Sequence, residues 1–405
     1  MAPIADLHDA LQDLSELIDR RLVVTDERLR VVAYSIHEAD LDRARLSVVL
    51  AHSDSWQVPP GGAGPITQDI PGIGPVVFTP LRDHRHRVGF LLLALEPEEA
   101  ALPRPVAGHV AEHAGELGLL LSLRTLYAER DRNRVRALLE GVLASDPERR
   151  RAAASALVDE GLLGGSRQYS AVAVGPDPRD PRFDPAQADA TARIAVEAII
   201  DFVGRTSTAS VAGAALGDGL GILVFPRPVV AERLVRILGE YAGVRAGLGP
   251  LVPDLMAVGE SFARARDAWR VGCATAAPEP VLTWTDLGLD RLLIRLPLAD
   301  LTLADLPDPV HRLLTAGLGP DVLDTLSAYL AHGGDAAATA RALHIHRSTL
   351  YYRLDRIRAV AAVDLADGLV RRELHTGLRI AELAGLMARH DPYSDKVSDL
   401  SVQNS

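Results

Sequence analysis

Basic and hydroxyl side chains gather in one short stretch near the C-terminal end of the chain. The stretch holds Arg347, Ser348, Thr349, Tyr351, Tyr352, Arg353 and Arg356. Guanidinium and phenol groups reach phosphates, and short hydroxyl side chains let a helix approach base edges in the major groove. From Arg341 to Arg358 there are five arginines and one aspartate, whereas the whole 405-residue chain has a net charge of −11. These residues predict a local binding site for double-stranded DNA.

Two short helices are expected to precede this stretch. Apolar residues predict a helix over Asp321–His332, and the glycines at 333 and 334 end it where a left-handed cap is wanted. Asp335 then caps an alanine-rich helix, Ala336–Leu343, because its carboxylate accepts hydrogen bonds from backbone N–H groups. The small alanine side chains allow a neighbouring helix to approach closely.

A third helix is expected to begin near Arg347, after a turn over residues 343–346. Leu350, Leu354 and Ile357 recur at i, i+4 and i+7 and form its buried stripe, which leaves the cationic and hydroxyl side chains on the opposite face. This order fits a helix-turn-helix, although His344 stands where glycine is the commonest turn residue. An ordinary helical hairpin within a core is the alternative, but it explains neither the reversal of charge nor the polar face.

The middle of the chain predicts the order strand, helix, strand, strand, helix, strand. The segments are Tyr169–Gly175, Ala186–Val203, Thr208–Leu216, Leu220–Phe225, Val229–Tyr241 and Val244–Leu248. This is the ferredoxin-like plan, a sheet with helices on one face, which nucleotide cyclases share. A cyclase needs carboxylates on the first strand and at the hairpin to hold two metal ions. The first strand has none and the hairpin offers only Asp218, so we predict a non-catalytic scaffold or dimerisation domain, with no cofactor.

The first hundred residues predict a small mixed α/β domain. Its expected elements are a helix, Ala5–Arg20, a hairpin of Arg21–Thr25 and Arg30–Ser35, and strands Gly74–Leu81 and Val88–Leu95, with a Gly- and Pro-rich loop over Pro59–Pro71. Strand, loop and strand pairs between flanking helices resemble the GAF or PAS sensory class. No residue in this part of the chain identifies an effector pocket.

A long helix is expected from Pro105 to Glu140. Its apolar positions are Leu117, Leu120, Leu121, Leu123, Leu126, Val135, Leu138 and Leu139. Two interpretations remain open: the helix connects two domains and also pairs two subunits, or it packs only on its own domain.

The run from Leu326 to Ile380, which includes H-R-S-T-L-Y-Y-R-L, resembles the C-terminal helix-turn-helix of PucR/CdaR-type transcription regulators. Residues 244–272 and 281–293 resemble the GGDEF-like domain of that family. The resemblance implies a sequence-specific DNA-binding regulator, responsive to a small-molecule effector, that controls a catabolic operon as a homodimer or larger homo-oligomer.

The resulting fold class is α+β multidomain. We expect a GAF/PAS-like sensory domain over 1–103, a connecting helix over 104–145, a degenerate GGDEF-like domain over 146–300, a linker over 301–320, an all-α helix-turn-helix domain over 321–390 and a disordered tail over 391–405. The closing helix of the fifth segment is expected over Asp367–Leu386, and the candidates for packing under the motif are Leu369, Leu374, Leu378 and Ala381.

Two other function classes are the alternatives. One is a nucleotide cyclase or hydrolase with a regulatory tail, which the missing carboxylates oppose, and the other is a protein-interaction module whose last domain only dimerises. The pairs His84 and His86, and His344 and His346, lack the cysteine or convergent carboxylate of a metal site, so no metal is expected. No long uncharged apolar run occurs, the N-terminus lacks the basic residues of a secretory signal, and Cys273 is the one cysteine; we therefore expect a cytoplasmic protein that uses no membrane.

Overall fold

A computed structural model gives the fold and describes residues 6–36, 40–60, 62, 64–84, 86–206, 210–275 and 277–387. The chain divides into two compact units, Met1–Asn133 and Arg134–Ser405, which we describe separately. The expected tail, 391–405, lies outside the described residues. Among these residues, none of the helices combines the length and the apolar character needed to cross a membrane.

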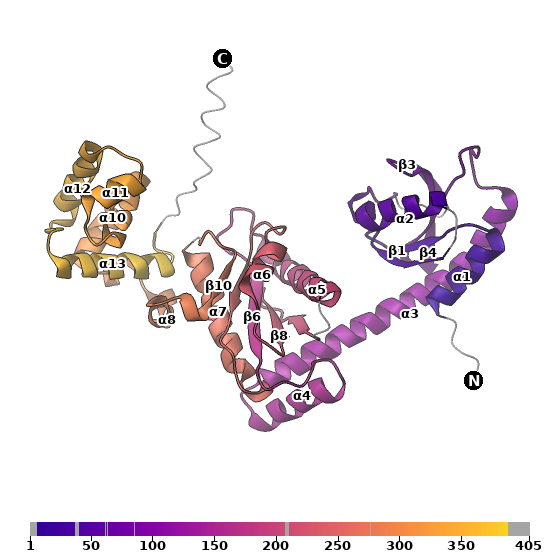
Figure 1. Ribbon diagram of the computed structural model, residues 1–405, viewed down its shortest axis with the longest axis horizontal. Helices are drawn as coiled ribbons and strands as arrows, with labels where there is room; N and C mark the ends of the chain where they lie inside the picture. Colours follow the sequence, from indigo (N-terminus) through magenta and orange to yellow (C-terminus); the bar gives the residue numbers. More distant parts are fainter. Residues whose placement is uncertain are drawn as a thin grey trace, which may run out of the picture. The chain divides into compact units, whose positions relative to one another are not determined.

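The first unit is built on a five-stranded antiparallel sheet in the order β2-β1-β5-β4-β3 (Figure 1). Its elements are α1 (Leu7–Ile18), β1 (Val23–Asp26), β2 (Val31–Tyr34), α2 (Asp40–His52), β3 (Ile66–Ile70), β4 (Gly74–Asp83), β5 (His86–Ala94) and the first part of α3 (Arg104–Val142). One face packs on the apolar sides of α1 and α3, and the other face buries Phe78 and Phe90 edge to face. Leu11, Leu81 and Leu91 are fully buried in the first of these cores.

Two elements of this unit were not predicted from the sequence. Helix α2 lies in a segment for which no element was expected, and β3 lies within the segment expected to be a loop, Pro59–Pro71. Strand β3 pairs with β4 from Ile66 opposite Phe78 to Ile70 opposite Gly74. An edge strand needs apolar contact on one face only, so the alternation of apolar and polar residues along β3 is weak. The glycines and prolines around it made the segment resemble a loop.

The second unit contains a second five-stranded sheet, in the order β10-β9-β6-β8-β7. Its elements are α4 (Pro147–Asp159), β6 (Ser170–Pro176), α5 (Ala188–Thr206), β7 (Ala212–Ala215), β8 (Gly221–Phe225), α6 (Ala231–Leu238), β9 (Val244–Leu248), α7 (Val258–Ala274), β10 (Val281–Thr283) and α8 (Asp290–Leu293). The predicted order βαββαβ is confirmed by β6, α5, β7, β8, α6 and β9. Strand β10 extends the sheet by pairing parallel to β9.

Both faces of this sheet are covered by helices, so the expectation of helices on one face was wrong. Val172 and Val174 of β6 pack against α5 and α6. The alternate residues Ala171 and Ala173 pack against α7, α4 and the last turns of α3. Side chains alternate between the two faces of a strand, and both sets here are apolar and fully buried. The sheet is therefore the middle layer of three.

The remaining helices form the C-terminal domain of the second unit. They are α9 (Asp308–Thr315), α10 (Pro320–Ala331), α11 (Ala336–Ala342), α12 (Arg347–Ala361) and α13 (Gly368–Leu383), and Figure 1 shows α10, α11 and α12 gathered on one side of α13. Helix α9 corrects the expected linker 301–320, because its Val310 and Leu313 are fully buried in the core of this domain. Pro307 and Asp308 open α9 as a helix start rather than as linker residues.

An ion pair joins α13 to α8. Arg379 donates from Nε to Asp290 Oδ1 at 3.0 Å and from an Nη atom to Oδ2 at 2.5 Å, and it also reaches Glu382 at 2.7 Å. Burial disfavours the charged form of Arg379, but these carboxylates outweigh it and raise its pKa above the ordinary value. Arg379 therefore carries its charge at neutral pH.

Candidate nucleic-acid interface

Helix α12 is held from behind by the stripe that its sequence predicts. Leu350, Leu354, Ile357 and Ala361 are buried in the C-terminal core. Their spacing places them on one side of the helix, so the other side is left to solvent. Helices α10 and α11 both contact α12, which fixes the orientation of the helix.

The turn before α12 has the geometry of a helix-turn-helix. Helix α11 ends at Ala342, and His344 then adopts a left-handed conformation with φ of 53°. The carbonyl groups of Ala340 and Arg341 accept hydrogen bonds from the N–H groups of Ile345 and His344. His344 thus occupies the position for which glycine is favoured, as its place in the sequence pattern indicates.

His346 is the N-cap of α12, a role that sequence reasoning missed. Its Nδ1 accepts a hydrogen bond from the backbone N–H of Ser348 at 3.3 Å and lies 2.8 Å from the Ser348 hydroxyl. Histidine is uncommon at an N-cap, where serine, threonine, aspartate and asparagine lead. The signal available in the sequence was position alone, since His346 directly precedes the first helical residue.

Six of the seven predicted site residues lie together at the start or on the open side of α12. Arg347, Ser348, Tyr351, Tyr352 and Arg356 are exposed, and Thr349 is half-buried. Neither Arg347 nor Arg356 forms an ion pair within the part of the chain that the structure describes. Their charges are therefore available to an external anion, and the hydroxyl groups beside them supply hydrogen-bond donors and acceptors.

Arg353, the seventh predicted residue, is directed toward α10. Its Nη atoms donate to the Asp321 carbonyl at 3.2 Å, the Asp321 carboxylate at 2.8 Å and the Thr325 hydroxyl at 3.1 Å. Only 21% of its side chain is exposed. The structure thus separates Arg353 from the other six residues, and its contacts hold α12 against α10.

Replacing Arg353 by alanine is expected to lower the free energy of unfolding of the C-terminal domain by about 1–2 kcal/mol. The buried hydroxyl of Thr325 and the Asp321 carboxylate would lose a charged donor. Urea unfolding followed by circular dichroism measures this loss. The slope of log K for DNA binding against log salt concentration should stay unchanged. If the variant has wild-type stability but a slope reduced by about one, Arg353 contacts DNA instead.

Replacing His344 by glycine should raise the free energy of unfolding by about 1 kcal/mol, because glycine enters the left-handed region without steric cost. The control is Ala342→Gly at the end of α11, which lies in ordinary helical conformation and should cost about 1 kcal/mol instead. Thermal unfolding of both variants provides the comparison. A destabilised His344→Gly protein would contradict the role given to this turn.

Asp335 caps α11 and gives the domain a pH-dependent contribution to stability. Its Oδ1 accepts from the N–H groups of Ala337 at 2.8 Å and Ala338 at 3.0 Å. The bond from Ala338, followed by that from Ala337, lowers the pKa of Asp335 below its ordinary 3.8. A carboxylate whose pKa is lower in the folded state stabilises that state above its unfolded pKa. The contribution is lost as the pH falls through the lower folded value.

Asp335→Asn should keep the helix cap but lose this contribution to the pH dependence of stability. Asp335→Ala removes the cap and should lower the thermal midpoint at every pH. Thermal melts from about pH 5 to about pH 2 measure both effects. Equal pH dependence in the Asn variant and the wild-type protein would assign the titration to another group.

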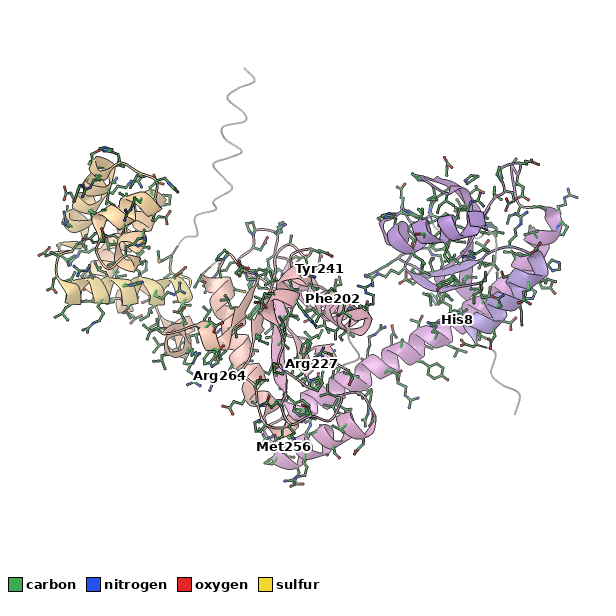
Figure 2. The ribbon with its side chains drawn as sticks, in the orientation of Figure 1. His8, Phe202, Arg227, Tyr241, Met256 and Arg264 are labelled. Atoms are coloured by element: carbon green, nitrogen blue, oxygen red, sulfur yellow. The ribbon has the colours of Figure 1, made fainter. Side chains whose placement is uncertain are left out.

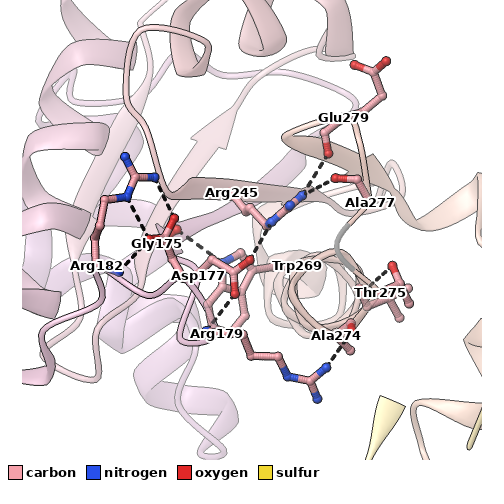
Figure 3. A network of polar contacts seen from close by, with 12 residues as sticks. Gly175, Asp177, Arg179, Arg182, Arg245, Trp269, Ala274, Thr275, Ala277 and Glu279 are labelled. Atoms are coloured by element: carbon pink, nitrogen blue, oxygen red, sulfur yellow. Dashed lines mark hydrogen bonds and ion pairs between the residues drawn. The ribbon is translucent and has the colours of Figure 1, made fainter. Parts of the chain in front are cut away.

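The middle domain lacks the paired carboxylates of a metal-dependent cyclase at the expected positions. Asp218 accepts from the Leu220 N–H at 3.2 Å and so stabilises the hairpin turn, and Asp189 accepts from the Gly219 N–H at 2.7 Å. Asp177, directly after β6, accepts a hydrogen bond from Arg245 Nε at 2.9 Å (Figure 3). Among the described residues, no three His, Cys, Asp or Glu side chains form a group that could hold a metal ion.

Residues 322–380 match the family model described as the PucR C-terminal helix-turn-helix domain. The matched segment runs from the start of α10 into α13 and contains α12. This part of the chain is therefore a PucR-type helix-turn-helix domain, and the prediction of a DNA-binding transcription regulator is confirmed at the level of this domain.

Two curated relatives are regulators. The carbohydrate diacid regulator of Escherichia coli (strain K12) is 31% identical over 153 residues, 37% of this chain and 40% of that protein. The purine catabolism regulatory protein of Bacillus subtilis (strain 168) is 27% identical over 146 residues, 35% of this chain and 26% of that protein. The chain thus spans less than half the length of these relatives. Both findings support the resemblance to PucR/CdaR regulators.

Among solved structures, the regulator of polyketide synthase expression from Bifidobacterium adolescentis matches 62% of this chain and 98% of that chain, at 19% identity. Its TM-score is 0.29.

Proposed function

We propose that this protein is a sequence-specific transcription regulator that binds double-stranded DNA by placing α12 in the major groove. The observation that carries the proposal is the open side of α12 within a PucR-type helix-turn-helix domain. There, two arginines without ion pairs among the described residues stand beside exposed hydroxyl groups, in a chain whose net charge is −11.

The residues of the interface divide into two roles by length and position. Ser348 and Thr349 are short and lie in the first turn, where a recognition helix approaches base edges most closely. Arg347, Arg356 and the two tyrosines have the reach to bind phosphates on either side of the groove. Arg353 acts as a positioning residue through α10.

We assign the other domains to sensing and coupling. The N-terminal domain, 1–103, is proposed to be a GAF/PAS-like sensor of a small-molecule effector, and the domain over 146–300 to be a degenerate GGDEF-like module without catalytic activity. The carboxylates that bind backbone N–H groups or arginine in that module support a structural role for them. The names of the two regulators above support control of a catabolic operon. From the family resemblance we assign this control to a homodimer or higher homo-oligomer in the cytoplasm.

Selection of bound fragments from a random DNA pool, followed by titration of the selected duplex with the full chain, tests the proposal. Specific binding should be at least about a thousandfold tighter than binding to an unrelated duplex at the same salt concentration. A variant with both Ser348→Ala and Thr349→Ala, the two residues assigned to base edges, should lose most of this preference, while its circular dichroism spectrum stays that of the wild-type protein. Equal affinity for all duplexes would overturn the proposal.

A further inference from the structure

Helix α3 has apolar side chains on two opposite sides, and the described residues of the first unit cover only one of these sides. Val110, Leu117 and Leu121 are 3%, 1% and 1% exposed, in the core of the first unit. Leu119 and Leu126 follow Leu117 by two and nine positions, which at about 100° per residue places both on the opposite side of the helix. A surface helix needs one apolar stripe to pack on its own domain, so the second stripe requires another explanation.

The second stripe is open to solvent along its length. Leu119, Leu123 and Leu126 are 48%, 37% and 57% exposed, and Tyr127 beside them is 59% exposed. We call Leu119, Leu123, Leu126 and Tyr127 the α3 stripe. Every residue from Leu123 to Arg134 is exposed, so a second helix has access to this stretch from the side of the stripe.

Helix α1 covers the other side of α3. Its Leu7, Leu11 and Leu14 belong to the same core as Leu117. Figure 2 labels His8 on α1, alongside α3, and its Nδ1 lies 3.2 Å from an Nη atom of Arg124. The first unit thus uses α1 and its sheet to cover one side of α3, and leaves the α3 stripe uncovered.

We propose that the α3 stripe is a dimer interface that pairs with the α3 stripe of a second copy of this chain, with the two helices antiparallel and Leu123 at the twofold axis. In this register Leu123 meets Leu123 of the second copy, and Leu119 meets Tyr127. Four apolar side chains from each copy are then removed from water, which is the favourable term in most protein association.

The charges beside the stripe favour the antiparallel arrangement. Glu116 and Arg130 are each seven positions from Leu123, in opposite directions, and both are exposed. Neither has an ion pair among the described residues. In an antiparallel pair centred on Leu123, each Glu116 meets an Arg130 of the second copy. In a parallel pair Arg130 would meet Arg130 and Glu116 would meet Glu116, and such like-charge contacts are unfavourable.

This inference deepens the homodimer of the proposed function, because a two-fold regulator reads two half-sites with two recognition helices. Only the biological role of the dimer rests on the proposed function. The pairing itself is a property of α3 and is measured without DNA.

Sedimentation equilibrium of the full chain tests the interface. Leu123→Arg places two cations against each other at the twofold axis and should weaken the dimer at least about a hundredfold. The matched control is Ala128→Arg, which adds the same side chain to an exposed position on the other side of α3 and should leave the dimer unchanged. The circular dichroism spectra of both variants should equal that of the wild-type protein, since neither side chain is buried within its own chain.

Charge reversals test the direction of the helices. Glu116→Arg and Arg130→Glu should each weaken the dimer by roughly three- to tenfold, because each turns two exposed ion pairs into repulsions. The double variant should restore wild-type affinity in the antiparallel register. In a parallel register each position meets the same position of the second copy, so neither the single variants nor the double variant should change the affinity. A wild-type monomer, a dimer insensitive to Leu123→Arg, or a double variant as weak as the single variants would overturn the proposal.

The same variants separate this inference from the function of α12. Leu123→Arg should bind a duplex with one half-site as the wild-type monomer does, but lose the additional affinity for two half-sites. If the wild-type protein forms the dimer but binds no duplex, the proposed function is rejected and the α3 interface is still supported.

Discussion

Alanine at Arg347 or Arg356 is expected to weaken binding to the selected duplex by about tenfold per recognition helix, and the two together by about a hundredfold. Each arginine has an exposed guanidinium group without an ion pair in the part of the chain that is described, so its removal costs the free protein little. The loss appears in the complex, where each guanidinium replaces counterions on the phosphates.

The salt dependence of binding identifies these contacts as phosphate contacts. Each arginine that binds a phosphate contributes about one unit to the slope of log K against log salt concentration. Arg347→Ala and Arg356→Ala should therefore each reduce the slope by about one, with similar losses of affinity for related sequences. A loss confined to one base pair of the site would assign that arginine to a base edge instead.

A control for nonspecific charge effects is Arg193→Ala on α5, an exposed arginine of the middle domain. It changes the net charge by the same amount and should leave both affinity and slope unchanged. Wild-type affinity and slope in the Arg347→Ala and Arg356→Ala proteins would show that DNA is not bound by this side of α12.

The sequence predicted α12 well because its information is local. The spacing of Leu350, Leu354 and Ile357, the charge reversal and the short turn before Arg347 are all visible within about 20 residues. The direction of Arg353 was not visible in this way. Its partner Asp321 lies 32 positions away, and only the packing of α10 on α12 brings the two together.

The elements that were missed have weak or misleading local patterns. Helix α9 follows a proline in a segment that resembles a linker, and its burial depends on α12 and α13. Strand β3 lies at a sheet edge between glycines and prolines. In the middle sheet, the two-sided covering depends on α7 and on α4, which lie outside the six elements of the βαββαβ plan. Such tertiary contacts decide which secondary structure a short apolar segment adopts and which of its faces is buried.

Gly247→Ala is expected to destabilise the middle domain by at least about 3 kcal/mol. Val244, Ala246 and Leu248 of β9 face α5 and α6, so Gly247 faces α7. A Cβ atom at Gly247 would clash with the carbonyl oxygen of Ala265 and the backbone nitrogen of Trp269. Both are backbone atoms of α7, which cannot turn aside as a flexible side chain can.

The clash caused by Gly247→Ala can therefore be relieved only if α7 moves away from the sheet. That movement disturbs the packing of Phe262 and Ala265 against β6 and β8, and of Arg264 over the ring of Trp284, where the two groups are 5.2 Å apart. Two of the three tryptophans, Trp269 and Trp284, lie in this domain, so urea unfolding followed by tryptophan fluorescence reports on it directly. The urea midpoint should fall well below that of the wild-type protein.

Gly204→Ala is the matched control, because Gly204 lies on the exposed side of α5 and an added Cβ atom there meets nothing within 4 Å. Alanine is favoured over glycine within a helix, so this variant should be more stable by up to about 1 kcal/mol. The opposite signs of the two glycine replacements follow from one difference, the approach of the α7 backbone to β9. Equal stability of Gly247→Ala and wild-type protein would mean that α7 lies farther from the sheet than the structure places it.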